Sequence, residues 1–164
     1  MKIVGSIVLL VVLSVPGLAQ TSHLPLQNVR KVTVYVAISG KDTDAMETIL
    51  KNLVELRLRM AGLTVLSMEE AKKDPDIIPS VELSIILLEL KNVGGYHTGY
   101  AFSTSLGVLD PMPSRNGNWA AMELWTDRSL QAVGTDNLTE NLRSGTNNLL
   151  DELMNSWLRA NPKK

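Results

Sequence analysis

The chain of 164 residues contains no cysteine. This absence excludes disulfide bonds, thiolate metal ligands and cysteine nucleophiles together. A domain without such cross-links has to be held together by its hydrophobic core. Among exported proteins, small domains without disulfides are commoner in bacteria than in animals, so export of this chain would favour a bacterial envelope protein.

Histidine is almost as scarce, since the chain has two, and only His97 lies outside the amino-terminal region. A metal site with two or more histidines is therefore excluded within the domain. Serine–histidine catalysis needs an orienting carboxylate and an oxyanion hole, and neither Ser103 nor Ser105 lies in a G-x-S-x-G motif. An enzyme would have to use carboxylates or His97 alone. We predict no catalytic residues, no metal, no cofactor and no enzymatic activity.

An excess of one charge is also missing. The chain has 16 basic and 17 acidic residues, and removal of an amino-terminal segment that contains Lys2 leaves 15 basic residues and a net charge of −2. A nearly neutral domain has no electrostatic field that would hold nucleic acid or an anionic membrane. Nucleic acid is therefore not a predicted partner.

One long apolar run is present, at residues 3–15, directly after Lys2. It ends at Pro16 and is shorter than the roughly 20 residues that a membrane-spanning helix needs. A positive residue, a short apolar run and small residues after it are typical of a secretory signal peptide. The alternative is an uncleaved membrane anchor.

Gly17 and Ala19 occupy the −3 and −1 positions of a predicted cleavage site before Gln20. We therefore predict export to the periplasm or the medium, with no membrane span after cleavage. The predicted organisation is a signal peptide at 1–19, a flexible leader at 20–28 and a single α/β domain at 29–164.

Hydrophobic periodicity predicts the first elements of the domain. Residues 29–38 alternate in hydrophobicity, which predicts a strand, and residues 44–61 have apolar residues at helical spacing. A second strand at 63–67 is predicted to be parallel to the first because a helix joins them. The predicted buried side of the helix carries Met46, Ile49, Leu50, Leu53, Leu56 and Met60.

Capping patterns predict where the first two helices begin and end. Asp44 with Glu47, and Ser67 with Glu70, have the spacing of capping boxes. Gly62 is predicted to end the long helix in the left-handed conformation.

The second half of the chain is predicted to be mostly strands. Residues 81–90 are apolar on both faces, which predicts a central strand with something covering at least part of its second face. The remaining elements are predicted as strands at 100–108, 119–126 and 130–133, a loop at 110–118, a turn at 126–129, and a helix at 138–161 capped by Asn137 and Glu140.

The order β-α-β-(short α)-β-β-β-α predicts an α+β fold, a two-layer α/β sandwich with a mixed sheet and both main helices on one face. The other sheet face is then open or covered by another molecule. Residues predicted on it are Tyr35, Ala37, Ile86, Leu88, Trp119, Ala121 and Trp125.

An apolar sheet face in a soluble protein usually marks an interaction surface. The predicted interface residues are Tyr35, Ile86, Leu88, Trp119 and Trp125. The predicted partner is another protein or a second copy of the chain. The alternative is that the leader or the 110–118 loop covers this face.

The stretch "GGYHTGYAFSTS" at 94–105 gathers aromatic residues, glycines and His97. Two glycines between alternating strands are typical of a hairpin turn. A second hypothesis is a small-ligand or peptide-binding protein, in which Tyr96, His97 and Tyr100 of the 94–100 hairpin form a mouth with the 110–118 loop.

Three segments carry a resemblance to known proteins: "LVELRLRMAGLTV" at 53–65, "WAAMELW" at 119–125 and "LLDELMNSWLRANPKK" at 149–164. The chain resembles short secreted bacterial proteins of unassigned function, and its layout resembles the TolB amino-terminal domain. The resemblance implies an exported α/β module and assigns no site residues.

Overall fold

The computed structural model describes residues 26–40 and 43–162, so the predicted signal peptide and residues 20–25 of the leader lie outside the described residues. None of the helices in this part of the chain combines the length and the hydrophobicity needed to span a membrane. The elements are β1 (Lys31–Ser39), α1 (Asp44–Ala61), β2 (Thr64–Val65), α2 (Met68–Ala71), β3 (Ser80–Lys91), β4 (His97–Pro113), β5 (Trp119–Val133), the 3-10 turn η1 (Thr135–Asn137) and α3 (Leu138–Ala160).

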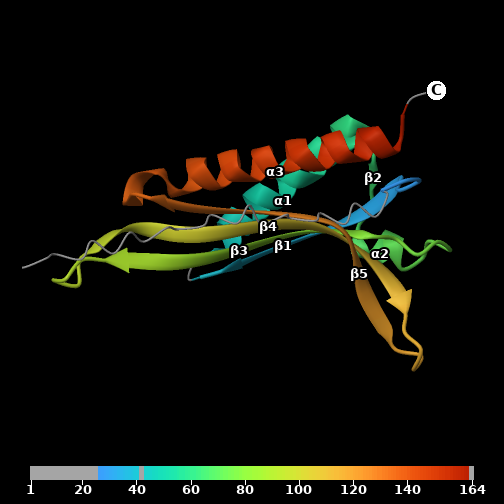
Figure 1. Ribbon diagram of the computed structural model, residues 1–164, viewed down its shortest axis with the longest axis horizontal. Helices are drawn as coiled ribbons and strands as arrows, with labels where there is room; N and C mark the ends of the chain where they lie inside the picture. The colour runs from blue at the N-terminus through green and yellow to red at the C-terminus, as the bar shows by residue number, and fades with distance from the viewer. Residues whose placement is uncertain (1–25, 41–42, 163–164) are drawn as a thin grey trace, which may run out of the picture.

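The five strands form one mixed sheet in the order β2-β1-β3-β4-β5. β1 is parallel to both β2 and β3, whereas β3, β4 and β5 are successively antiparallel. Helices α1 and α3 contact each other and lie on the same side of the sheet (Figure 1). The predicted α+β sandwich, the parallel pairing of β1 with β2 and the central position of β3 are confirmed.

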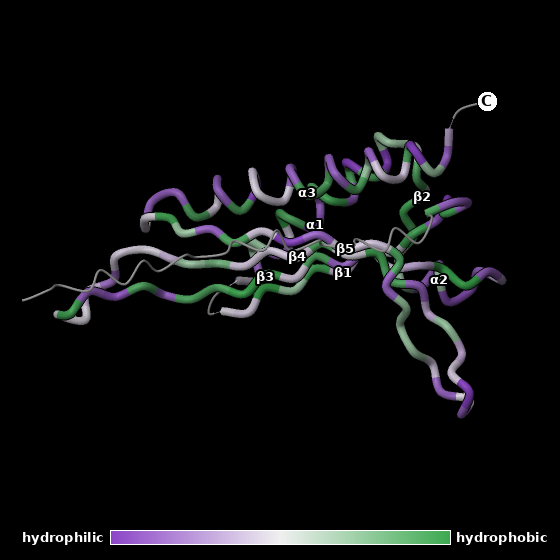
Figure 2. Tube along the Cα trace, viewed as in Figure 1, coloured by the Kyte–Doolittle hydropathy of each residue, from purple (hydrophilic) through white to green (hydrophobic). Residues whose placement is uncertain are grey.

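The hydrophobic core lies between this sheet and the two helices. Hydrophobic and hydrophilic residues alternate along α1 and α3, as expected for helices that bury one side (Figure 2). The buried side of α1 centres on Leu50, Val54 and Leu58, whereas Leu56 and Met60 are exposed. The predicted stripe was therefore partly wrong, because α1 has apolar residues on more than one side.

Two of the predicted helix boundaries are confirmed in detail. Gly62 has a φ of 98°, and the N–H of Leu63 donates to the Leu58 carbonyl at 3.1 Å, which ends α1 in a left-handed cap. Ser67 and Glu70 form a complete capping box at the start of α2.

The other two predicted caps are wrong. The Glu47 carboxylate accepts a hydrogen bond from the backbone N–H of Ile38 at 2.9 Å, so it binds the end of β1 instead of pairing with Asp44. Asn137 precedes α3 but its side chain makes no capping hydrogen bond. The hydrogen bonds of these side chains depend on the folded structure, so the spacing of the residues along the chain does not predict them.

The described part of the leader belongs to the packed body. Leu26 is buried in the core, and its carbonyl accepts a hydrogen bond from Asn161 Nδ2 at 2.8 Å. Trp157 Nε1 donates to the Val29 carbonyl at 2.8 Å. The end of α3 therefore holds the segment before β1, and the packed body includes Leu26.

The edge strand β5 is longer than predicted. Thr126, Asp127, Arg128 and Ser129 pair in register with β4, so the predicted turn at 126–129 and separate strand at 130–133 are wrong. Within this run Arg128 is exposed and the other three residues are only partly buried, so the edge of the sheet accommodates four polar residues in a row.

The strands β4 and β5 extend beyond the rest of the sheet as a two-stranded arm, defined here as residues 109–123. β4 continues to Pro113, and only residues 114–118 form a turn, so the predicted 110–118 loop is mostly strand. An irregularity in the β4–β5 ladder lies between Val108 and Leu109, and the pairing of β3 with β4 ends at Leu109, opposite Ser80. From there the arm bends away from the helices, toward the uncovered side of the sheet (Figure 1).

Candidate interaction surface

The sheet face opposite α1 and α3, here called the open face, carries large apolar side chains. Tyr35 is 60% exposed, Ile86 53%, Leu88 61% and Leu130 79%. A solvated sheet face normally carries polar residues, so these side chains need an explanation. Helices α1 and α3 do not cover them, since both pack on the other face (Figure 1).

Strand register brings three of these side chains together. Ile86 lies opposite Ser103, which in turn lies opposite Leu130. Leu88 is next on the same face of β3, in a row with Ala101 of β4. The small residues between them leave one apolar patch, defined here as Ile86, Leu88 and Leu130.

Tyr35 lies apart from this patch. It pairs with Glu82, which is four residues from Ile86 along β3 and therefore about 13 Å away. The sequence placed Tyr35, Ile86 and Leu88 on one face correctly but did not show this separation. Leu130 was missed because a turn was predicted just before it.

Trp125 does not lie on the open face. It is 5% exposed and pairs with Val108, which is also in the core. The ladder shifts by one residue at Leu124, because Val108 pairs with Trp125 but Leu109 pairs with Glu123. A β-bulge of this kind moves every later side chain to the opposite face, so the prediction that grouped Trp125 with Trp119 is wrong.

Trp119 lies on the arm and is 65% exposed. It lines a groove of about 600 Å³ in which the arm, α2 and the segment before β3 meet the open face. Most of the lining residues are apolar: Met68, Ala71, Ile77, Ile78, Leu109, Pro111, Trp119 and Ala121. Glu82, Lys72 and Asp76 are the charged residues that line it.

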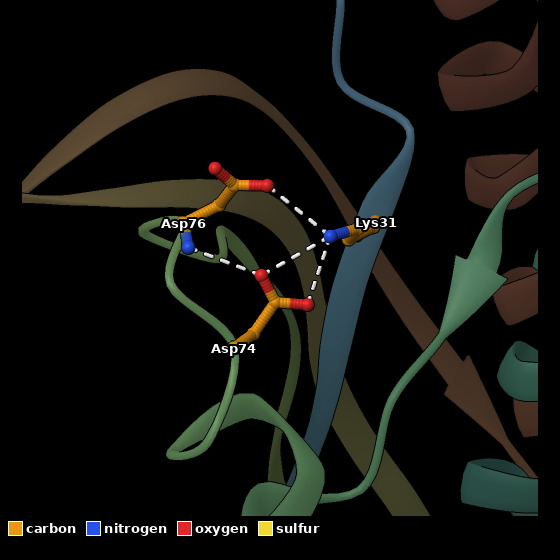
Figure 3. A network of polar contacts seen from close by, with 3 residues as sticks. All are labelled: Lys31, Asp74 and Asp76. Atoms are coloured by element: carbon orange, nitrogen blue, oxygen red, sulfur yellow. Dashed lines mark hydrogen bonds and ion pairs between the residues drawn. The ribbon is translucent and has the colours of Figure 1, made fainter.

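An ion-pair network fastens one wall of this groove. Lys31 Nζ lies 2.8 Å from Asp74 Oδ2 and 3.1 Å from Asp76 Oδ2, and the backbone N–H of Asp76 donates to Asp74 Oδ1 at 3.0 Å (Figure 3). The hydrogen bonds from Lys31 and from the Asp76 backbone lower the pKa of Asp74, and the two aspartates raise the pKa of Lys31. The network ties the segment after α2 to β1.

Low pH is expected to weaken the ion pair between Lys31 and Asp74, because the Asp74 carboxylate becomes protonated. Because the pKa of Asp74 is lowered in the folded protein, its stabilising effect is present above the ordinary value of 3.8 and is lost as the pH falls through the folded value. The wild type should unfold at a higher urea concentration than Asp74→Asn at neutral pH, and this difference should shrink below about pH 4.

Urea unfolding followed by circular dichroism at several pH values measures this effect. The control is Glu123→Gln, an exposed residue of the arm for which no ion pair is seen among the described residues. A difference between wild type and Asp74→Asn that stays constant down to the lowest pH would contradict the expected contribution of the carboxylate.

The hairpin with the predicted ligand-binding residues is a turn with local contacts. The Asn92 side chain accepts hydrogen bonds from the N–H groups of Gly94 and Tyr96, both at 3.0 Å. His97 Nε2 donates to the Gly99 carbonyl at 2.8 Å, and the His97 ring meets the Tyr100 ring edge-on at 4.6 Å between centroids.

The predicted mouth between this hairpin and the 110–118 segment does not form. The turn between β3 and β4 and the turn between β4 and β5 lie at opposite ends of the sheet (Figure 1). Successive antiparallel strands reverse direction, so two consecutive turns necessarily lie at opposite ends. Tyr96 and His97 therefore share no cleft with Trp119.

Comparison with known proteins shows likeness in fold at low identity. No family model matches the sequence, and no curated protein does either. PelC from Paraburkholderia phytofirmans, solved as a dodecamer, is 15% identical, with 82% of this chain and 92% of PelC covered and a TM-score of 0.48. A minor lipoprotein from Acinetobacter baumannii is 16% identical, with 81% and 95% covered and a TM-score of 0.40.

Rare lipoprotein B from Shewanella oneidensis is 13% identical, with 77% of this chain and 94% of the lipoprotein covered and a TM-score of 0.32. The structural neighbours thus include bacterial lipoproteins. TM-scores below 0.5 carry no inference about what this chain binds, and the layout resemblance to the TolB domain stays a prediction.

Proposed function

We propose that this protein is an exported, non-enzymatic interaction module that binds a protein partner through the apolar patch of its open face. The observation that carries the proposal is the exposure of Ile86, Leu88 and Leu130, each more than half exposed on neighbouring strands. These side chains project from paired strands, so the backbone that carries them is already ordered before a partner covers them.

Two further features support the proposal. The amino-terminal pattern of Lys2, residues 3–15 and Ala19 favours export. The ring of His97 is engaged with its own hairpin through Gly99 and Tyr100, which favours a structural role for the one histidine of the domain.

Substitution on the open face tests the proposal. The double variant Ile86→Ser, Leu130→Ser removes two apolar side chains that are already solvent-exposed, so the fold should persist. Binding of the native partner is expected to fall at least about tenfold, because buried apolar anchors dominate interface energetics. Co-purification from envelope extracts, quantified against wild type, is the measurement.

The matched control is Leu56→Ser on α1, which removes an equally exposed apolar side chain from the other side of the molecule. It should leave co-purification unchanged. If the open-face variant retains the same partners as wild type, or if Leu56→Ser loses them equally, the open face is not the binding surface.

A further inference from the structure

The arm lacks the support that a two-stranded ribbon normally needs. Beyond Leu109 its strands pair only with each other, and an isolated two-stranded hairpin is marginally stable in water. Met112, Trp119 and Met122 on the arm are nevertheless exposed apolar residues. An exposed apolar ribbon of this kind indicates that another surface covers it.

The β4 edge of the arm is closed to an added strand. Pro111 and Pro113 have no N–H to donate, so they remove two hydrogen-bond donors from a strand that β3 no longer accompanies. Side-chain packing is therefore the mode of contact expected on this side of the arm.

The groove at the base of the arm offers a matching surface. Met68 and Ile77 are exposed apolar residues in its lining, next to Trp119. Glu82 also lines it, and its carboxylate accepts a hydrogen bond from Ser80 Oγ at 3.0 Å. Among the described residues, Glu82 has no basic partner within ion-pair distance.

A matching positive charge lies at the tip of the arm. Arg115 is exposed in the turn at 114–118, and the described part of the chain gives it no acidic partner. Glu82 pairs with Gly107, and the extended strand from Gly107 to the turn is about 20 Å long. Arg115 makes no ion pair with Glu82 of its own chain in the structure.

We propose that the arm of one copy of this protein seats in the groove of a second copy, where Arg115 pairs with the partner's Glu82. Each chain carries both an apolar arm with a basic tip and an apolar groove with an acidic residue, so a second copy supplies both halves of the contact. The nearly neutral net charge gives no overall repulsion between copies. This contact uses a different surface from the open-face patch and does not depend on it.

Charge reversal across the contact tests the proposal. Sedimentation equilibrium should show self-association of the wild-type protein, weakened at least about tenfold by Arg115→Glu and by Glu82→Arg. The double variant that exchanges the two charges should restore association to within about threefold of wild type. The control Arg143→Glu, an exposed charge on α3, should leave association unchanged and should not rescue Glu82→Arg.

Thermal unfolding by circular dichroism identifies any variant that loses its fold. If Glu82→Arg does so, Glu82→Gln replaces it, with a smaller expected loss of association. A protein that remains monomeric at millimolar concentration overturns the proposal, as does a double variant no better than either single variant. The open-face variant should associate as wild type does, which separates this test from that of the proposed function.

Discussion

Trp125→Ala is expected to lower the free energy of unfolding by about 3–5 kcal/mol. Trp125 is 5% exposed and belongs to the hydrophobic core, where it pairs with the buried Val108 of β4. Truncation removes its buried apolar surface and leaves a cavity that a close-packed interior fills only in part. Urea unfolding followed by far-ultraviolet circular dichroism, with the slope shared between variants, gives the difference.

Trp119→Ala is the matched control, because it removes the same side chain from the same strand. Trp119 is 65% exposed, so the expected change in the free energy of unfolding of the monomer is within about 0.5 kcal/mol. If the two variants unfold at the same urea concentration, Trp125 is not part of the core and the assigned bulge at Leu124 is wrong.

Local patterns in the sequence predicted the elements whose neighbours along the chain determine them. The bounds of α1 follow from helical periodicity and from Gly62. Gly62 ends the helix through its left-handed backbone conformation, which does not depend on distant contacts. The position of β3 follows from apolar residues on both faces. The order of these elements was then enough to predict a mixed sheet with two helices on one side.

Features that depend on one inserted residue or on distant contacts were not predictable in this way. The bulge at Leu124 adds a single residue to β5, and no pattern in "WAAMELW" reports it. It nevertheless decides whether Trp125 lies in the core or on the open face. Similarly, Glu47 has capping-box spacing, but the fold brings the N–H of Ile38 within its reach.

The failure of the predicted ligand mouth has a different cause, because the information to avoid it was available. The strands at 81–90, 100–108 and 119–126 were all predicted, and successive antiparallel strands place their turns at alternate ends. The arm was not predicted because its sequence contains Pro111, Pro113 and Gly117, which are typical of a loop. Here the two prolines lie on an edge of β4 that other strands cannot join, and Gly117 lies in the tight turn that follows.

Gly99→Ala is expected to lower the free energy of unfolding by about 3 kcal/mol or more. A Cβ atom at residue 99 would lie 2.2 Å from the Val133 carbonyl oxygen and 3.2 Å from Gly134 Cα. Both are backbone atoms, so no side chain can rotate to relieve the clash. The end of β5 would have to move away from β4, which disrupts the ladder just before η1 and α3.

Gly107→Ala provides the control on the same strand, because its Cβ would meet its nearest neighbour, the Trp125 carbonyl oxygen, at an ordinary contact distance of 3.5 Å. It should change the free energy of unfolding by less than about 1 kcal/mol. Hydrogen exchange adds a local readout, since the strain at Gly99 should raise the exchange of amides near Val133 and leave those of β1 protected. Equal stability of the two variants would mean that β5 does not approach Gly99 as closely as this backbone geometry requires.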